Sequence, residues 1–142
     1  MRKILLTVLL IISLSAVLAA CGGGSDSGGE TADNGVGNVA NGEKLFNQTT
    51  IGSNSAPGCI TCHSLEPGVV LVGPSHSDIA IRAETAVPGM SAEEYIRQSI
   101  LEPNAHITEG YAEGVMYQNY ATELPAPNID DIVAFMLTLK GG

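Results

Sequence analysis

The first apolar stretch of the chain differs from everything that follows it. Residues 4–18 are apolar apart from small hydroxyl side chains, and they follow the basic start Met1-Arg2-Lys3. A basic start, an apolar run and small residues at its end are typical of an export signal. The alternative is a membrane-spanning anchor, although the run is at the short end of the roughly 20 residues that a bilayer requires. We therefore expect residues 1–20 to be a cleaved signal.

The end of this run favours one type of export signal. The sequence Leu18-Ala19-Ala20-Cys21 resembles the bacterial lipobox, in which cleavage leaves the cysteine as a new N-terminus that carries acyl chains. This resemblance implies a lipoprotein signal peptide over residues 1–20 and lipidation of Cys21.

A low-complexity segment separates Cys21 from the rest of the chain. Residues 22–30 have the sequence GGGSDSGGE, and low complexity continues to about residue 37 without an apolar face to bury. We expect a flexible linker over residues 21–37, with a root-mean-square reach of about 20–24 Å. The folded domain is then expected over residues 38–142.

Two later apolar patterns predict helices that pack together. In residues 39–47 (VANGEKLFN), Gly42 and Phe46 are four positions apart and would share one helix face. Residues 128–140 (NIDDIVAFMLTLK) are apolar nearly all round after an N-cap at Asn128, so this helix must be buried. Because glycine permits close approach, we expect the C-terminal helix to pack at Gly42.

A further helix is predicted by a capping box. Ser91 and Glu94 form the S-x-x-E pattern, and Pro103 stops the helix. The residues of its apolar face are Tyr95, Ile96, Ser99 and Ile100. A shorter helical turn is expected within residues 77–83, and the remaining segments are rich in Gly and Pro. The pattern therefore predicts a small all-α domain connected by loops.

The charge of the chain limits its partners. The full sequence has a formal net charge of −9, and loss of residues 1–20 would leave four basic residues against fifteen acidic ones, a charge of −11. We do not expect nucleic acid as a partner, because neutralising phosphates requires Lys and Arg. A basic protein partner fits such a surface, whereas acidity that serves only solubility is the alternative.

The sequence CITCH at residues 59–63 carries the chemistry. Two cysteines at this spacing occur in disulfides, zinc sites, redox-active dithiols and haem attachment sites. A zinc site needs a second ligand pair, and His76 and His106 are scattered. A thioredoxin-like dithiol follows a strand in an α/β pattern, which this sequence does not show. A disulfide across two residues closes too small a loop to stabilise much, and it leaves the adjacent histidine unexplained.

Haem attachment gives a role to all three residues. In Cys-x-x-Cys-His the two thiols add to the vinyl groups of haem, and the adjacent imidazole becomes an axial ligand of the iron. Export agrees with this chemistry, which takes place outside the cytoplasm. We therefore expect one haem c, attached covalently to Cys59 and Cys62, with His63 as an iron ligand.

These motifs, in this order, resemble those of class I cytochrome c, a monohaem electron-transfer family. The likeness covers about residues 42–139 through GEKLF, CITCH, VGPS, GVM in a loop and DIVAFMLTL in the last helix. It implies a fold in which the N- and C-terminal helices cross beside the haem and a third helix covers one edge. It also implies that the carbonyl of Pro74 accepts a hydrogen bond from His63. One departure is Tyr117, which follows GVM where the family often has proline.

The sixth iron ligand has three methionine candidates. Met90 has a sufficient role as a hydrophobic staple beside the capping box, and Met136 lies among core residues of the last helix. Met116 lies in the loop YAEGVMYQNY, where no helical periodicity buries it, and its place downstream of CITCH matches the family's distal ligand. We expect Met116 to bind the iron. His106 is the main alternative, and His76 is a lesser one because we expect it to face solvent.

An iron whose two axial positions are both filled by the protein favours electron transfer rather than catalysis. If both axial positions are filled, no substrate can coordinate, and the change available is one electron. We therefore expect a carrier and not an enzyme. The alternatives are a haem enzyme of the peroxidase kind and a haem-based sensor, and both need a displaceable distal ligand. The sequence has a single Cys-x-x-Cys-His, which disfavours the usual two-haem peroxidase plan.

The resemblance also bears on location and partners. It extends to membrane-anchored cytochromes of bacterial respiratory and photosynthetic chains, including the small cytochrome subunit of alternative complex III. It implies a lipid anchor on the outer face of the cell membrane, and a redox protein or a multisubunit quinol-oxidising complex as partner. No nucleic acid or small-molecule substrate is expected. The linker fits a swinging shuttle or a fixed subunit, and the likeness to respiratory lipoproteins favours the subunit.

Overall fold

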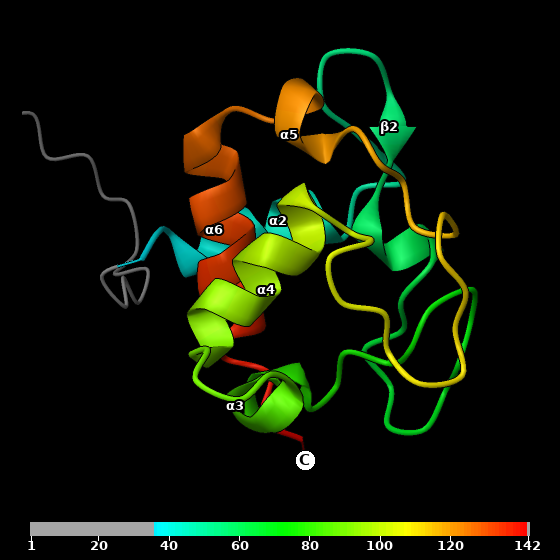
Figure 1. The fold of residues 1–142 in the computed structure, drawn as a ribbon. Coiled ribbons are helices and arrows are strands. Elements are labelled where there is room, and N and C mark those ends of the chain that lie inside the picture. The colour runs from blue at the N-terminus through cyan, green and yellow to red at the C-terminus, as the bar shows by residue number, and fades with distance from the viewer. Residues whose placement is uncertain (1–35, 142) are drawn as a thin grey trace, which may run out of the picture.

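The computed structural model describes residues 36–141, so the expected signal peptide, Cys21 and nearly all of the linker lie outside the described residues. Helices form one half of the domain and long loops form the other (Figure 1). The elements are α2 (Val39–Phe46), β1 (Thr50–Ile51), β2 (Ala56–Pro57), the 3₁₀ turn η2 (Cys59–Thr61), α3 (Ile79–Ala86), α4 (Ala92–Leu101), α5 (Tyr120–Glu123) and α6 (Ala126–Met136). The predicted all-α class is confirmed, with a two-stranded antiparallel pair as the small addition.

The first and last helices of the described chain, α2 and α6, cross in direct contact. A Cβ atom added at Gly42 would lie 1.8 Å from the carbonyl oxygen of Asp131, so only glycine allows this approach. The carboxylate of Asp131 also accepts hydrogen bonds from the backbone N–H of Asn38 (2.7 Å) and from the side-chain amide of Asn41 (2.6 Å). It thereby places negative charge at the N-terminus of α2, where the helix dipole favours it. The predicted contact at Gly42 is confirmed.

Replacing Gly42 with alanine should destabilise the domain by about 3 kcal/mol or more. The added methyl group meets backbone atoms of α6 rather than a flexible side chain, so the two helices must move apart. Thermal or urea unfolding measures the loss. Glu43→Ala changes an exposed position of the same helix and should stay within about 0.5 kcal/mol of the unmodified protein. Equal stability of the two variants would contradict the close crossing.

The start of α6 differs from the prediction. The sequence pattern predicts Asn128 as the N-cap, but the N-cap is Pro125 and the helix runs from Ala126 to Met136. The reason is Pro127, which stands in the first turn, where its fixed φ suits the helix and its missing N–H costs nothing. The helix also ends at Met136, and a turn follows in place of the predicted continuation to residue 140.

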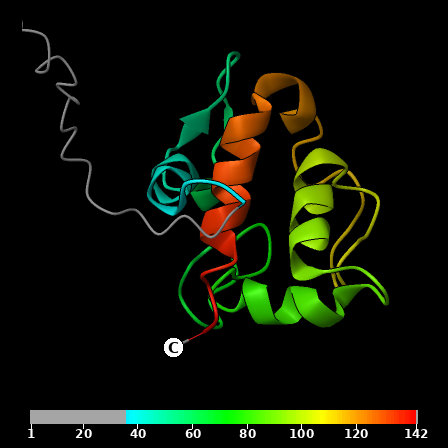
Figure 2. The same ribbon diagram turned by 90° about the vertical axis from the view of Figure 1, so that its left-hand side faces the viewer.

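The capping box of α4 is confirmed. The Ser91 hydroxyl accepts from the N–H of Glu94 at 3.2 Å, and the Glu94 carboxylate accepts from the N–H of Ser91 at 2.8 Å. Arg97 then joins α4 to α6 through Asp130, with 2.6 Å between Nη1 and Oδ1. The turn expected within residues 77–83 is a longer helix, α3, which begins at Ile79 and crosses below α4 and α6 in Figure 2.

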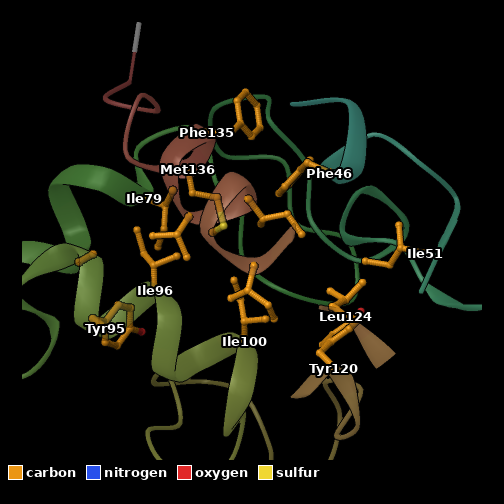
Figure 3. Packing of buried hydrophobic residues seen from close by; sticks show 14 of the residues in the cluster. Phe46, Ile51, Ile79, Tyr95, Ile96, Ile100, Tyr120, Leu124, Phe135 and Met136 are labelled. Carbon is orange, nitrogen blue, oxygen red and sulfur yellow. The ribbon is translucent and has the colours of Figure 1, made fainter. Parts of the chain in front are cut away.

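Apolar side chains from α2, α3, α4 and α6 meet in one core (Figure 3). Its most completely buried large residues are Phe46, Ile96, Ile132 and Val133. The rings of Phe46 and Phe135 pack edge to face with 5.5 Å between centroids, which fixes the crossing of α2 and α6. In the described residues, no helix has the length and apolar character needed to cross a membrane.

Candidate functional site

A cavity of about 510 Å³ opens between the helical core and the long loops. This volume lies within the range of roughly 300–1,000 Å³ that is usual for cofactor and ligand pockets. Its lining is predominantly apolar, and it includes core residues of α2, α4 and α6. The chemically active residues on its wall are Cys59, Cys62, His63, His76, His106 and Met116.

One tight turn carries both cysteines and His63. The N–H groups of Cys62 and His63 both donate to the carbonyl of Cys59, at 3.1 and 2.9 Å, so the three side chains project from a single 3₁₀-like turn. Both thiols are free in the structure. Burial raises the pKa of the Cys59 thiol to about 12, which is opposite to the lowered pKa of a redox-active dithiol. This environment does not suit a redox-active dithiol.

The carbonyl group of Pro74 orients the imidazole of His63. Its Nδ1 lies 2.9 Å from the carbonyl oxygen of Pro74, and only a protonated Nδ1 can donate there. The lone pair is then on Nε2, which is the atom left free to bind a metal. Burial lowers the pKa of His63, and this keeps the ring in the neutral form that binds metals. Gly73 is required beside the ring, because a Cβ there would lie 2.4 Å from Cε1 of His63.

The prediction that His76 faces solvent is wrong. Its ring stacks on His63 with 3.9 Å between centroids and 11° between planes, and the edge of Phe46 lies beside it. The backbone N–H of His76 donates to the carbonyl of Ser64 at 2.8 Å, and this bond folds the segment after Pro74 against the cysteine turn. Burial lowers the pKa of His76 well below its usual value, so the ring is neutral.

The position of His76 also disfavours it as the sixth ligand. Its ring stacks face to face on His63, so a group bound between the two imidazoles would have no room. Its Nδ1 is buried and, within residues 36–141, has no hydrogen-bond partner. We find no role for that nitrogen in the site, and the ring serves as packing behind His63.

The remaining candidates for the sixth ligand come from other elements. Met116 and His106 both line the cavity from the loop of residues 102–119. Met116 is partly buried against the core, whereas His106 is exposed and touches Tyr95 edge to face, with 5.7 Å between ring centroids. Met136 borders the cavity from α6 but is only 5% exposed in the core. Met116 as the sixth ligand stays a prediction.

Arg82 is a residue of the cavity wall that the sequence did not single out. Its guanidinium is held by the Asp78 carboxylate, with 2.7 Å between Nε and Oδ1, and by the carbonyl of Ser75 at 2.5 Å. A cation at the edge of an apolar cavity suits an acidic group of a bound cofactor. The sequence does contain an indication that Arg82 has a specific role, because it is one of only four basic residues after residue 20.

Apolar side chains remain exposed at the mouth of the cavity. Val72, Ile107 and Val115 line the cavity and are 52%, 37% and 51% exposed. Val72 ends a run of four consecutive exposed apolar residues, in which Val70 is 61% exposed. Single exposed apolar residues are ordinary, whereas four in a row beside a cavity are unusual on a protein surface.

Comparison with models of protein families finds a match to Cytochrome c over residues 39–140. Comparisons with curated proteins and with solved structures find no match.

Proposed function

Because the chain belongs to the cytochrome c family, we propose that it is a one-electron carrier whose haem iron is bound by His63 and Met116. Membership of the family means that the chain has the cytochrome c fold and carries a covalently attached c-type haem, for which Cys59 and Cys62 provide the attachment motif. It also means that the function is haem-based electron transfer. The ligand set, the partner and the membrane context are the parts that we propose here.

The residues of the cavity fit this cofactor. When bound, the haem supplies reversible exchange of one electron at iron. Cys59 and Cys62 would hold it from one turn, while the carbonyl of Pro74 keeps Nε2 of His63 available as a ligand. The surrounding apolar side chains would shield the cofactor from water. The observation that carries the proposal is this oriented, neutral imidazole in an apolar cavity that Met116 also lines.

Carbon monoxide separates the carrier from the enzyme and the sensor. A carrier with both axial positions filled should bind carbon monoxide slowly in its reduced form, because the sixth ligand must leave first. A peroxidase-like enzyme or a gas sensor should bind it readily. Flash photolysis or rapid mixing with the reduced protein gives the answer, and fast binding would overturn the carrier proposal.

The mouth of the cavity is the proposed site of electron exchange. Around the exposed Val72, Ile107 and Val115, the adjoining loops carry Glu66, Glu109 and Glu113. No Lys or Arg occurs in residues 45–81 or 98–139. We infer a redox partner with an apolar centre and a basic rim, since such a surface complements this one in both respects.

The salt dependence of electron transfer should reveal how this partner is held. For a free shuttle, raising salt should slow the reaction steeply, because screening shortens the range of attraction to about 10 Å at 0.1 M. For a permanent subunit, transfer takes place inside a preformed complex and should hardly respond. Our proposal is a subunit of a membrane complex of the quinol-oxidising kind in a respiratory chain. Stopped-flow traces on washed membranes, recorded over a series of salt concentrations, distinguish the two arrangements. A rate that falls steeply with salt, together with activity restored by added soluble domain, would contradict the subunit.

The lipid anchor is proposed from the lipobox, which precedes the described residues, and from the linker, of which nearly all precedes them. Lipidation of Cys21 would hold the domain on the outer face of the membrane. Cells fed a labelled fatty acid should carry label on this chain, and Cys21→Ser should remove it. Stable anchoring needs more than one acyl chain, since one alone binds a bilayer only marginally. Cys59→Ser serves as the control that keeps the label, and a labelled Cys21→Ser variant would contradict the lipobox.

A further inference from the structure

The residue that follows Met116 is anchored by its side chain. The hydroxyl of Tyr117 donates a hydrogen bond to Oε1 of Glu123 in α5. Glu123 is 8% exposed, and its other carboxylate oxygen accepts from the backbone N–H of Asn54 at 3.1 Å. A buried carboxylate thus holds the loop at the residue next to the proposed ligand.

A second anchor holds the two sides of the same loop. The side chain of Asn104 accepts from the N–H of Gly114 at 2.9 Å and donates to Oε1 of Gln118 at 2.8 Å. The amide of Gln118 donates in turn to the carbonyl of Met116 at 2.5 Å. Residues on both sides of Met116 are therefore fixed to Asn104, while Tyr117 is fixed to Glu123.

We propose that Tyr117, through its hydrogen bond to Glu123, is the positioning residue that keeps Met116 on the iron. This inference rests on the proposed His63 and Met116 ligation. Proline, which the family often has after this methionine, limits a loop by fixing a backbone dihedral. Tyrosine leaves the backbone free, so the restraint has to come from a side-chain contact, and the bond to a buried carboxylate provides it. Charge-assisted bonds of this kind are stronger than neutral ones.

The bond would act on the fraction of time during which Met116 is dissociated. Without it, the loop has more conformations open to it when Met116 is off the iron, and that dissociated state becomes more populated. Loss of one hydrogen bond to a carboxylate corresponds to about a tenfold change in such an equilibrium. Carbon monoxide binding requires the dissociated state, so its rate measures this population directly.

The test compares Tyr117→Phe with Tyr120→Phe in the full haem-loaded chain. Each variant loses one phenolic hydroxyl, but Tyr120 donates to the carbonyl of Pro57 at 2.6 Å, outside the loop of Met116. In Tyr117→Phe, the Met–iron charge-transfer absorbance should fade on heating well before the helices unfold, as followed by circular dichroism. Carbon monoxide should also bind to its reduced form about tenfold faster. In Tyr120→Phe, the absorbance should disappear together with the helices, even if both do so at a lower temperature.

Glu123→Gln examines the same bond from its other end and keeps the side-chain volume. We expect the same direction of change as in Tyr117→Phe, to a smaller extent. If the absorbance fades together with the helices in both variants and carbon monoxide binding is not faster, the positioning role is wrong while the carrier proposal stands. A Met–iron absorbance missing already from the unmodified protein would overturn the Met116 ligation, and the positioning role with it.

Discussion

Replacing both Cys59 and Cys62 with alanine is expected to abolish covalent haem attachment and to leave the domain without a stable fold. The two thiols are the atoms that bond to the cofactor, and both lie on the wall of the cavity that it fills. Without the cofactor, the apolar side chains that line this cavity lose the group against which they pack, and the domain loses that part of its core. A typical domain is stable by only about 5–15 kcal/mol, so a loss of this kind can abolish the fold.

Mass spectrometry of the acid-denatured protein measures the attachment. The unmodified chain should retain the mass of one haem, and the double variant should retain none. Cys62→Ala alone is the informative control, because a single remaining thioether should still hold the haem through denaturation. A double variant that keeps haem after acid treatment would show that other residues make the attachment. An unmodified chain with no haem mass would be evidence against the cofactor in this chain.

Replacing Met116 with alanine should abolish the Met–iron charge-transfer absorbance and lower the reduction potential. A thioether ligand favours reduced iron, so its loss stabilises the oxidised form relative to the reduced one. Met90→Ala and Met136→Ala should both keep the absorbance. Met136 is only 5% exposed in the core, so its variant should nevertheless lose about 2–5 kcal/mol of stability. Redox titration and absorbance spectra of the three variants give the comparison.

An unchanged spectrum in Met116→Ala would move the sixth ligand to His106. That residue lines the same cavity and comes from the same loop, so it is the alternative that the geometry leaves. His106→Ala should then remove the ligand in place of Met116→Ala. His76→Ala should leave the sixth ligand in place in either case, because its ring stacks on His63.

Local signals in the sequence predict those features that depend on neighbouring residues. The capping box of α4 joins Ser91 to Glu94 within one turn, and both hydrogen bonds are present. The close crossing at Gly42 is also predictable, because a glycine on the apolar face of a helix leaves room for the backbone of a second helix. The N-cap of α6 lies three residues before the predicted Asn128, because Pro127 favours the first turn of a helix and Asn128 therefore falls inside it.

Contacts across the chain could not be predicted in this way. His76 follows a Gly-Pro turn, and nothing in its local sequence indicates that a bond to Ser64 turns its ring onto His63. The hydrogen bond from Tyr117 to Glu123 could not be predicted from the local sequence either. The two residues are six positions apart, and the buried place of Glu123 depends on its packing beside the segment that contains Asn54. Such pairs become visible only when the loops have been placed in space.

The crossing of α2 and α6 has a consequence for the order of events during folding. Asn38 and Asp131 are 93 positions apart, so their contact closes nearly the whole domain into one loop. Loop closure of this length is entropically costly and slow compared with local helix formation. Because α6 is synthesised long after α2, α2 has no partner until nearly all of the domain has been made. The turn with Cys59 and Cys62 is held by local hydrogen bonds and needs no such closure, so its two thiols can react before α2 and α6 meet.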